Sequence, residues 1–161
     1  MPAPPRGPQA GRQHAARPQG PRPVTLVVDA SVAIKWVAPE TGSEEADLLL
    51  AGDHDLEAPD LLAGEAASAP WKKTVRGALS ARQAREALDV LLHGGLTWHP
   101  TSTVLPRALE LARLARHPVY DCVYLALAER IDGAVVTADE SLLRIARARR
   151  IGARTLASFR R

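Results

Sequence analysis

Short apolar segments rich in β-branched residues alternate with longer amphipathic segments along most of the chain. The first of them, residues 24–28, reads VTLVV, and a nearly continuous apolar run of this length is typical of a strand buried on both faces. Further short strands are expected at 56–58, 96–99, 134–137 and 153–156. Strands that alternate with helices predict an α/β fold, here a three-layer α/β/α sandwich around a central, mainly parallel sheet.

Helices are predicted between these strands. They are expected at residues 31–38, 43–51, 61–76, 80–93, 104–115, 121–130 and 140–149. Ser80 is a suitable N-cap for the fourth helix, and Gly94-Gly95 is a suitable stop for it. Pro70 is expected to kink or split the third, because proline lacks the N–H group that a helix interior uses.

Four acidic residues lie at or near the predicted strand ends. Asp29 directly follows the first strand, and Asp139 stands two residues past a later one. Asp121 opens a helix, where free N–H groups favour a carboxylate, and Glu65 lies one turn into another. Since function in parallel sheets gathers outside the carboxyl ends of the strands, we expect these side chains to share one cleft.

Four converging carboxylates would repel each other unless a divalent cation lay among them, and such hard oxygen ligands favour Mg²⁺ or Mn²⁺ over zinc. Each acid taken singly also has a plain structural interpretation. Asp29 and Asp139 could cap helices, Asp121 could serve the helix dipole, and Glu65 could be a solvated helix residue. Their joint placement favours the metal site.

Four segments in the same order also carry a family resemblance. They are Val27–Val32, Ala58–Leu62 leading to Glu65 and Trp71, Tyr120–Ala128, and Val136–Leu143. Together they resemble PIN-domain ribonucleases, especially the VapC-like toxins of bacterial toxin–antitoxin pairs. The resemblance runs from residue 24 to about residue 156.

The resemblance implies an activity and a set of site residues. Asp29, Glu65, Asp121 and Asp139 would be the metal-binding catalytic acids, with the hydroxyls of Ser31 and Thr137 beside them. The implied protein is a cytoplasmic, Mg²⁺- or Mn²⁺-dependent endoribonuclease that hydrolyses RNA phosphodiester bonds. It would be restrained by a small antitoxin protein and would form a homodimer.

Two departures from the family pattern concern the orientation of the Glu65 side chain. Ser68 stands where many relatives carry asparagine, and Pro70 interrupts a helix that is usually continuous. They leave open a catalytically silent interaction module on the same fold. A DNA nuclease on this fold is a further alternative, although such enzymes usually carry large insertions.

Charge is strongly segregated although the net charge is only +3. Residues 1–23 hold four arginines and no acid, and residues 142–161 hold seven arginines and no acid. Two basic groups are therefore candidates for contact with RNA phosphates, or else are solvated basic faces. One is Arg144, Arg147 and Arg150, spanning about 120° of a helix face, and the other is Lys72, Lys73 and Arg76.

The N-terminal segment is expected to lie outside the folded domain, which would span residues 24–161. Residues 1–23 contain seven prolines and three glycines but no Leu, Ile, Val or aromatic residue, so we expect disorder. The segment lacks the apolar stretch of a secretory signal, and its prolines break a transit helix. It is either a basic arm that contacts RNA, or an inert extension or mis-assigned start.

Other residue types exclude several classes of protein. No apolar run approaches the ~20 residues that cross a bilayer, and no glycine-rich nucleotide-binding pattern occurs, so neither a membrane span nor a nucleotide cofactor is expected. The single cysteine, Cys122, allows no disulfide framework and is expected to pack as a small apolar group. The five histidines lack metal-ligand spacing. Trp36, Trp71 and Trp98 are expected in the core or a dimer interface.

Overall fold

The structure is a computed structural model that describes residues 24–160. Its strands are β1 (Val24–Val28), β2 (His54–Pro59), β3 (Thr97–His99), β4 (Ala134–Thr137) and β5 (Gly152–Thr155). Its helices are α1 (Ala30–Val37), α2 (Ser43–Ala51), α3 (Leu61–Val75), α4 (Ala81–His93), α5 (Leu105–Ala115), α6 (Val119–Arg130) and α7 (Glu140–Ala148), with short 3₁₀ turns at Thr101–Thr103 and Leu156–Phe159. The predicted tail, residues 1–23, lies outside the described residues.

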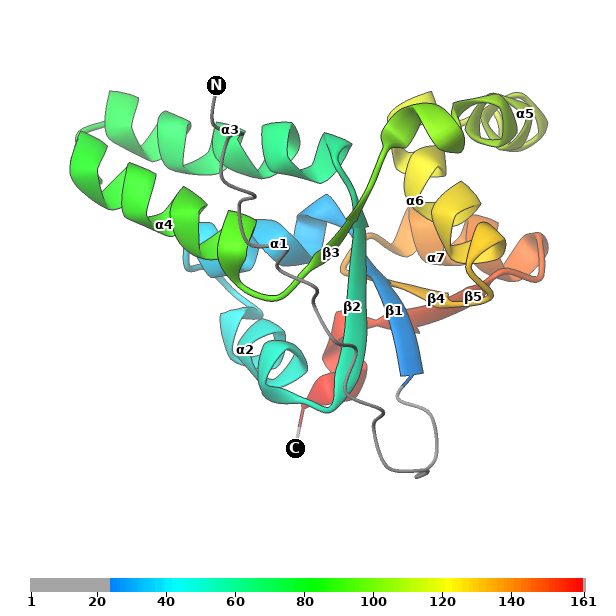
Figure 1. The fold of residues 1–161 in the computed structure, drawn as a ribbon, viewed down its shortest axis with the longest axis horizontal. Helices are drawn as coiled ribbons and strands as arrows, with labels where there is room; N and C mark the ends of the chain where they lie inside the picture. Colours follow the sequence, from blue (N-terminus) through cyan, green and yellow to red (C-terminus); the bar gives the residue numbers. More distant parts are fainter. Residues whose placement is uncertain (1–23, 161) are drawn as a thin grey trace, which may run out of the picture.

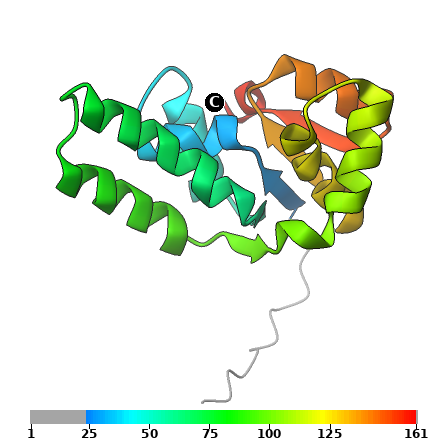
Figure 2. The same cartoon turned by 90° about the horizontal axis from the view of Figure 1, so that it is seen from above.

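All the described strands pair in parallel, in the order β3-β2-β1-β4-β5. Helices α1–α4 lie on one side of this sheet, with α3 and α4 packed on α1, and α5–α7 lie on the other side (Figures 1 and 2), which confirms the predicted three-layer α/β/α sandwich. From β1 the chain crosses to β2, whereas from β4 it crosses to β5 in the opposite direction. The order therefore reverses between β1 and β4, and such switch points are where parallel sheets build their sites.

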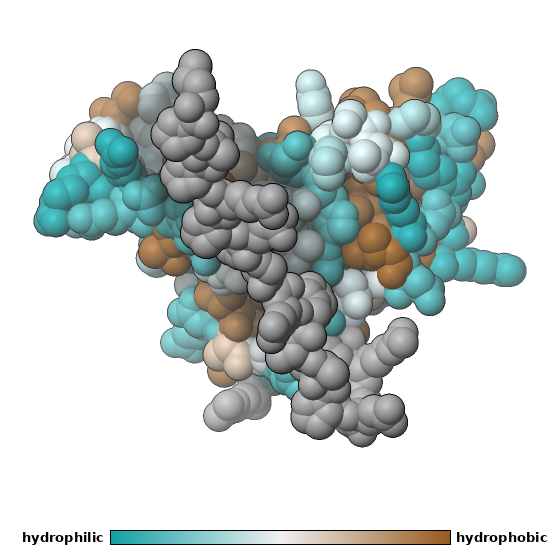
Figure 3. All heavy atoms as spheres, viewed as in Figure 1, coloured by the Kyte–Doolittle hydropathy of each residue, from teal (hydrophilic) through white to brown (hydrophobic). Residues whose placement is uncertain are grey.

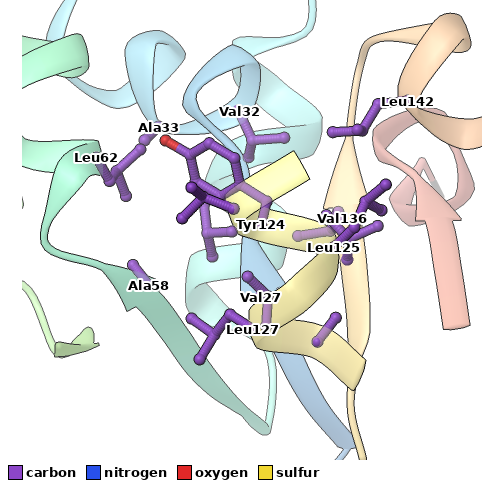
Figure 4. Close-up of a cluster of buried hydrophobic side chains, with 14 of the residues drawn as sticks. Val27, Val32, Ala33, Ala58, Leu62, Tyr124, Leu125, Leu127, Val136 and Leu142 are labelled. Atoms are coloured by element: carbon purple, nitrogen blue, oxygen red, sulfur yellow. The ribbon is translucent and has the colours of Figure 1, made fainter. Parts of the chain in front are cut away.

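The core lies between the sheet and helix α6. Residues Cys122 to Ala128 of α6 are all buried, and so are the β1 residues Leu26, Val27 and Val28. Figure 4 shows Tyr124 inside this cluster, with its hydroxyl oxygen directed toward Leu62 of α3. Seven consecutive buried residues leave the middle of α6 without an amphipathic stripe, so α6 is the central helix of its layer.

Several element boundaries differ from the prediction. Helix α3 continues through the buried Pro70 without being split, and the Pro70 carbonyl accepts a hydrogen bond from Thr74 Oγ1 at 2.9 Å. Helix α6 begins at Val119, so Asp121 lies in its first turn rather than at its start.

Two further expectations concern single residues. Trp71 is 62% exposed and is not a core residue. Ser80 caps α4 through a complete capping box with Gln83, as its sequence predicted.

Helices α3 and α4 project together beyond the edge of the sheet (Figure 2). A small apolar depression lies where α4 meets α1 and α2, lined by Trp36, Leu50, Val90, Leu91 and Leu96. Hydrophobic side chains are visible between α4 and α2 in Figure 3. No helix among the described residues is long and apolar enough to cross a membrane.

Candidate active site at the carboxyl edge of the sheet

Asp29 stands where β1 ends and α1 begins. Its backbone N–H donates to the Val136 carbonyl at 3.1 Å, which continues the pairing of Val28 with Val136 and sets Asp29 beside the end of β4. Its carboxylate also caps α1 by accepting from the Ser31 N–H at 3.3 Å. Asp29 is therefore held at the switch point by both its backbone and its side chain.

Two hydroxyl groups converge on the same carboxylate oxygen of Asp29. Ser31 Oγ donates to Asp29 Oδ2 at 2.6 Å, and Thr137 Oγ1 donates to it at 2.7 Å. Burial of this side chain, which is 5% exposed, raises the pKa of Asp29, although these donors pull it down. The structure thus places both predicted supporting hydroxyls on one buried carboxylate.

Asp139 is joined to Asp29 through Thr137. Thr137 Oγ1 accepts from the Asp139 N–H at 2.9 Å while it donates to Asp29. The Asp139 carboxylate caps α7 by accepting from the Ser141 N–H at 2.7 Å. One hydroxyl on β4 therefore links two of the four predicted acids.

Glu65 reaches the site from α3 and meets α6. The Tyr124 hydroxyl donates a short hydrogen bond to Glu65 Oε2. Half-burial raises the pKa of Glu65, the Tyr124 donor lowers it, and the charges of Asp29 and Asp121 raise it again. The same burial and the neighbouring Glu65 carboxylate raise the pKa of the Tyr124 phenol far above its usual value, so Tyr124 stays a donor.

The start of α3, and with it Glu65, is positioned by the end of β3. Asp60 Oδ1 accepts from both the N–H and the hydroxyl of Thr101, at 2.9 and 2.5 Å, and these bonds lower the pKa of Asp60. Thr101 Oγ1 in turn accepts from the Leu61 N–H at 3.1 Å. The chain is thereby fixed just before α3 begins.

Asp121 lies beside a histidine that precedes α6. His117 Nε2 is 2.7 Å from Asp121 Oδ2, an ion-pair contact when the imidazole is protonated. The contact is not aligned as a hydrogen bond, and this buried nitrogen has no other hydrogen-bond partner among residues 24–160.

Cys122 lies next to Asp121 in the chain. Burial raises the pKa of the Cys122 thiol to about 11, and the Asp121 charge raises it further, so Cys122 is the inert packed residue that was predicted.

The four acids are thus gathered at one edge of the sheet but are not equally close. Asp29, Glu65 and Asp121 are near enough for the charges of Asp29 and Asp121 to raise the pKa of Glu65, whereas Asp139 is linked through Thr137. Within the described part of the chain, no three His, Cys, Asp or Glu side chains form a group arranged to hold a metal ion. Each acid instead bonds or pairs with a protein group.

The donor set nevertheless fits a hard divalent cation. It consists of carboxylate and hydroxyl oxygens, and mutual repulsion and burial penalise the charged form of Glu65. A cation near these oxygens would offset that repulsion. Asp29, Glu65, Asp121 and Asp139 are the side chains that would hold it.

Two residues of the site, Tyr124 and His117, were not predicted from the sequence. Tyr124 follows Asp121 by three positions, and His117 precedes it by four, so both spacings place a polar group next to Asp121 on a helical surface. The proline between His117 and Asp121 argued against a helix there, so the spacing of His117 was not a usable signal. The spacing of Tyr124 could have been recognised, but its partner Glu65 lies on another helix and could not.

One of the two predicted basic groups does not form a continuous helix face. Helix α7 ends at Ala148, and Arg150 lies beyond it with a φ of 58°, so the expectation that Arg150 shares a helix face with Arg144 and Arg147 is wrong. Lys73 Nζ donates to the Pro39 carbonyl at 3.1 Å, which ties α3 to the end of α1. Lys72 and Arg76 are exposed.

A parallel α/β sandwich with carboxylates at its switch point defines a class of protein suited to hold a hard cation at that edge. A sequence profile described as the PIN domain matches residues 26–148. The chain belongs to the PIN-domain family, and the resemblance noted from its sequence is confirmed. It is 38% identical over 119 residues to ribonuclease VapC3 of Pyrobaculum aerophilum, covering 73% of this chain and 91% of the relative.

Solved structures share the fold at lower identity. The crystal structure of PAE2754 from Pyrobaculum aerophilum superposes with a TM-score of 0.65 at 22% identity, covering 84% of this chain and 91% of that one. VapBC2 from Rickettsia felis, bound to a DNA fragment from its promoter, gives a TM-score of 0.59 at 12% identity, covering 82% and 98%. Both comparisons support the architecture described above.

Proposed function

We propose that the protein is a metal-dependent endoribonuclease that hydrolyses RNA phosphodiester bonds, and that it is the toxin of a toxin–antitoxin pair. The supporting observation is the coupled set of carboxylates at the switch point, where the charges of Asp29 and Asp121 act on Glu65. The relationship to a VapC ribonuclease at 38% identity supports the reaction and its substrate class. Mg²⁺ or Mn²⁺ is the proposed cofactor.

The protein residues of this site would bind the cation and hold the acidic side chains in position. When bound, the cation supplies charge stabilisation at the phosphate and lowers the pKa of a bound water. Asp29 is oriented by Ser31 and Thr137 before any ligand arrives. Tyr124 orients the Glu65 carboxylate and favours its charged form against burial, because the phenol donates a hydrogen bond to it.

Cleavage assays with two nucleic acids test this proposal. Purified protein is incubated with single-stranded RNA or single-stranded DNA of the same sequence, with Mg²⁺ or Mn²⁺ and then with excess EDTA. Cleavage of RNA alone, lost in EDTA and in Asp29→Asn, is the expected result. Cleavage of DNA would indicate a DNA nuclease, and no cleavage of either would indicate a catalytically silent interaction module.

Two apolar surfaces support the proposed protein partners. Leu50 and Val90 are exposed beside the small apolar depression between α1, α2 and α4, and they present an apolar face that a helix of a small antitoxin can cover. On the opposite face of the sheet, Leu105 and Leu109 of α5 and Tyr120 of α6 are exposed, Leu109 by 63%. We place the homodimer contact on this second surface, because Leu105 and Leu109 lie one turn apart on the same face of α5 and grouped exposed apolar residues mark interfaces.

A further inference from the structure

A cavity of about 320 Å³ opens beside the acidic edge, between the end of α5, the turn that leads to α6, and α7. Its lining includes the polar side chains His117, Ser141, Arg144 and Arg149 and the apolar side chain Ile145. None of the four proposed metal-binding acids lines it. The cavity is therefore a neighbour of the carboxylate site with a different chemical character.

Two contacts connect the cavity to the acids. His117, in its wall, lies with Nε2 2.7 Å from Asp121 Oδ2. Ser141, also in its wall, donates its N–H to Asp139 Oδ1 at 2.7 Å. A molecule in the cavity would thus lie one side chain away from two of the carboxylates.

The arginines of the cavity carry charge that no acid neutralises. Arg144 Nη2 donates to Ser141 Oγ at 2.9 Å, and Arg149 Nη2 donates to the Leu114 carbonyl at 2.8 Å. Neither guanidinium forms an ion pair with an acidic side chain in residues 24–160. By contrast, Arg107 pairs with Glu110 and Glu129.

These features favour a phosphate group in contact with the arginines. A guanidinium presents several N–H donors in a planar fork that matches phosphate oxygens, and one bond to Ser141 or Leu114 leaves most of those donors available. The anchored positions also reduce the side-chain entropy lost on binding.

The rest of the cavity suits a larger group than a bare anion. Its volume is at the lower end of the range for small-molecule sites, and Ile145, Ala115 and Ala148 give it an apolar wall. We propose that the cavity is a subsite for one nucleotide of the RNA, with its phosphate at Arg144 and Arg149 and its base against Ile145. This inference rests on the proposed ribonuclease function, and it places the substrate strand across α7.

Mononucleotide binding tests the subsite without requiring cleavage. Uridine 5′-monophosphate is titrated into ¹⁵N-labelled full-length protein in EDTA, and backbone amide shifts are followed by NMR. We expect shifts at His117 and across α7. Arg144→Ala and Arg149→Ala should each weaken the apparent affinity about tenfold, as loss of a charge-assisted hydrogen bond does. Arg144→Lys should recover part of that loss.

Arg85→Ala is the matched control, because Arg85 is exposed on α4, far from the cavity, and its removal changes the net charge equally. Its affinity should equal that of the wild type. Equal affinities of wild type, Arg144→Ala and Arg149→Ala, or no shifts near α7, would overturn the subsite. Inorganic phosphate binding as tightly as the nucleotide would also overturn it, since the base would then contribute nothing.

The outcomes for the subsite and for the ribonuclease are separable. A protein that cleaves RNA with Mg²⁺ but fails the nucleotide titration keeps its proposed activity and loses the subsite. A protein that binds the nucleotide through Arg144 and Arg149 but cleaves no RNA keeps the nucleotide-binding cavity and loses the ribonuclease function. RNA cleavage at several salt concentrations adds a second readout, because loss of a phosphate contact reduces the salt dependence of binding by about one ion.

Discussion

The Tyr124 hydroxyl on α6 donates a hydrogen bond to the Glu65 carboxylate on α3, although the two residues are 59 positions apart. Tyr124 is fully buried, and Glu65 is half-buried. Two helices that belong to opposite faces of the sheet are thus connected at its edge by a phenol and a carboxylate. The bond favours the ionised form of Glu65 against the burial that raises its pKa.

Tyr124→Phe should reduce both stability and activity. The variant keeps the volume of the ring but removes the only side-chain donor to Glu65 recorded among the described residues. We expect a loss of about 1 kcal/mol in the free energy of unfolding, measured by urea denaturation, and about tenfold slower RNA cleavage. The acid limb of the pH–rate profile should move to higher pH, because the lost bond had lowered the pKa of Glu65.

Tyr120→Phe provides the control for this substitution, since Tyr120 lies on the same helix but is 61% exposed. It should leave the acid limb of the pH–rate profile where it is in the wild type, because the recorded side-chain donor to Glu65 is Tyr124 and not Tyr120. Full activity with an unshifted acid limb in Tyr124→Phe would show that Glu65 does not need its tyrosine partner.

Asp29→Asn should remove cleavage while stabilising the metal-free protein. Burial raises the pKa of Asp29 in the folded state, so the folded protein binds this proton more tightly than the unfolded chain. Stability contributed by this group therefore falls as pH rises from the ordinary value of 3.8 through the raised pKa. At pH 7 in EDTA we expect Asp29→Asn to be more stable by on the order of 1 kcal/mol.

That advantage should shrink as the pH is lowered toward the ordinary pKa of aspartate, where the wild-type carboxyl is protonated in both states. Asp47→Asn, an exposed substitution on α2, should change stability at neither pH. Cleavage by Asp29→Asn should fall by two orders of magnitude or more. If Asp29→Asn is less stable than the wild type at pH 7, the hydrogen bonds of the wild-type Asp29 carboxylate stabilise the fold by more than its buried charge destabilises it.

Divalent cations should stabilise the wild type and EDTA should reverse the effect. Binding to the folded state alone adds about 2.7 kcal/mol when the free cation is at 100 times its dissociation constant. Thermal unfolding with increasing Mg²⁺ or Mn²⁺ should therefore show a rising midpoint. Asp29→Asn should show a much smaller rise, and an unchanged wild-type midpoint at millimolar cation would count against the metal site.

Thr137→Val should remove the hydroxyl that links Asp29 to the backbone of Asp139 and so reduce both stability and activity. Thr137 is fully buried, and its hydroxyl donates to Asp29 Oδ2 while accepting from the Asp139 N–H. Valine keeps the shape but leaves these groups without that partner, at a cost of about 1–3 kcal/mol. Denaturation and cleavage should both be impaired, whereas Thr137→Ser, which keeps the hydroxyl, should retain most of each. Loss of activity in the serine variant would point to the methyl group instead.

The local elements of the fold could be predicted because their signals are local. The apolar runs at β1 and β4 and the helix α2 have the same bounds in the sequence and the structure, and Ser80 caps α4 through neighbours three residues away. The boundaries that differ involve competition with tertiary packing. Helix α3 continues through Pro70, whose own side chain is buried although Trp71 next to it is exposed.

By itself the sequence determined the order in which strands and helices alternate, that Ser80 caps a helix, and that Asp29 and Asp139 follow strand ends. Only the tertiary structure decided that β1 and β4 are neighbours, so that Thr137 bonds to a residue 108 positions away. It likewise decided that Tyr124 meets Glu65 and that His117 lies against Asp121. The reason is physical: periodicity and caps depend on neighbours within one or two turns, whereas strand order depends on how whole layers bury their apolar faces.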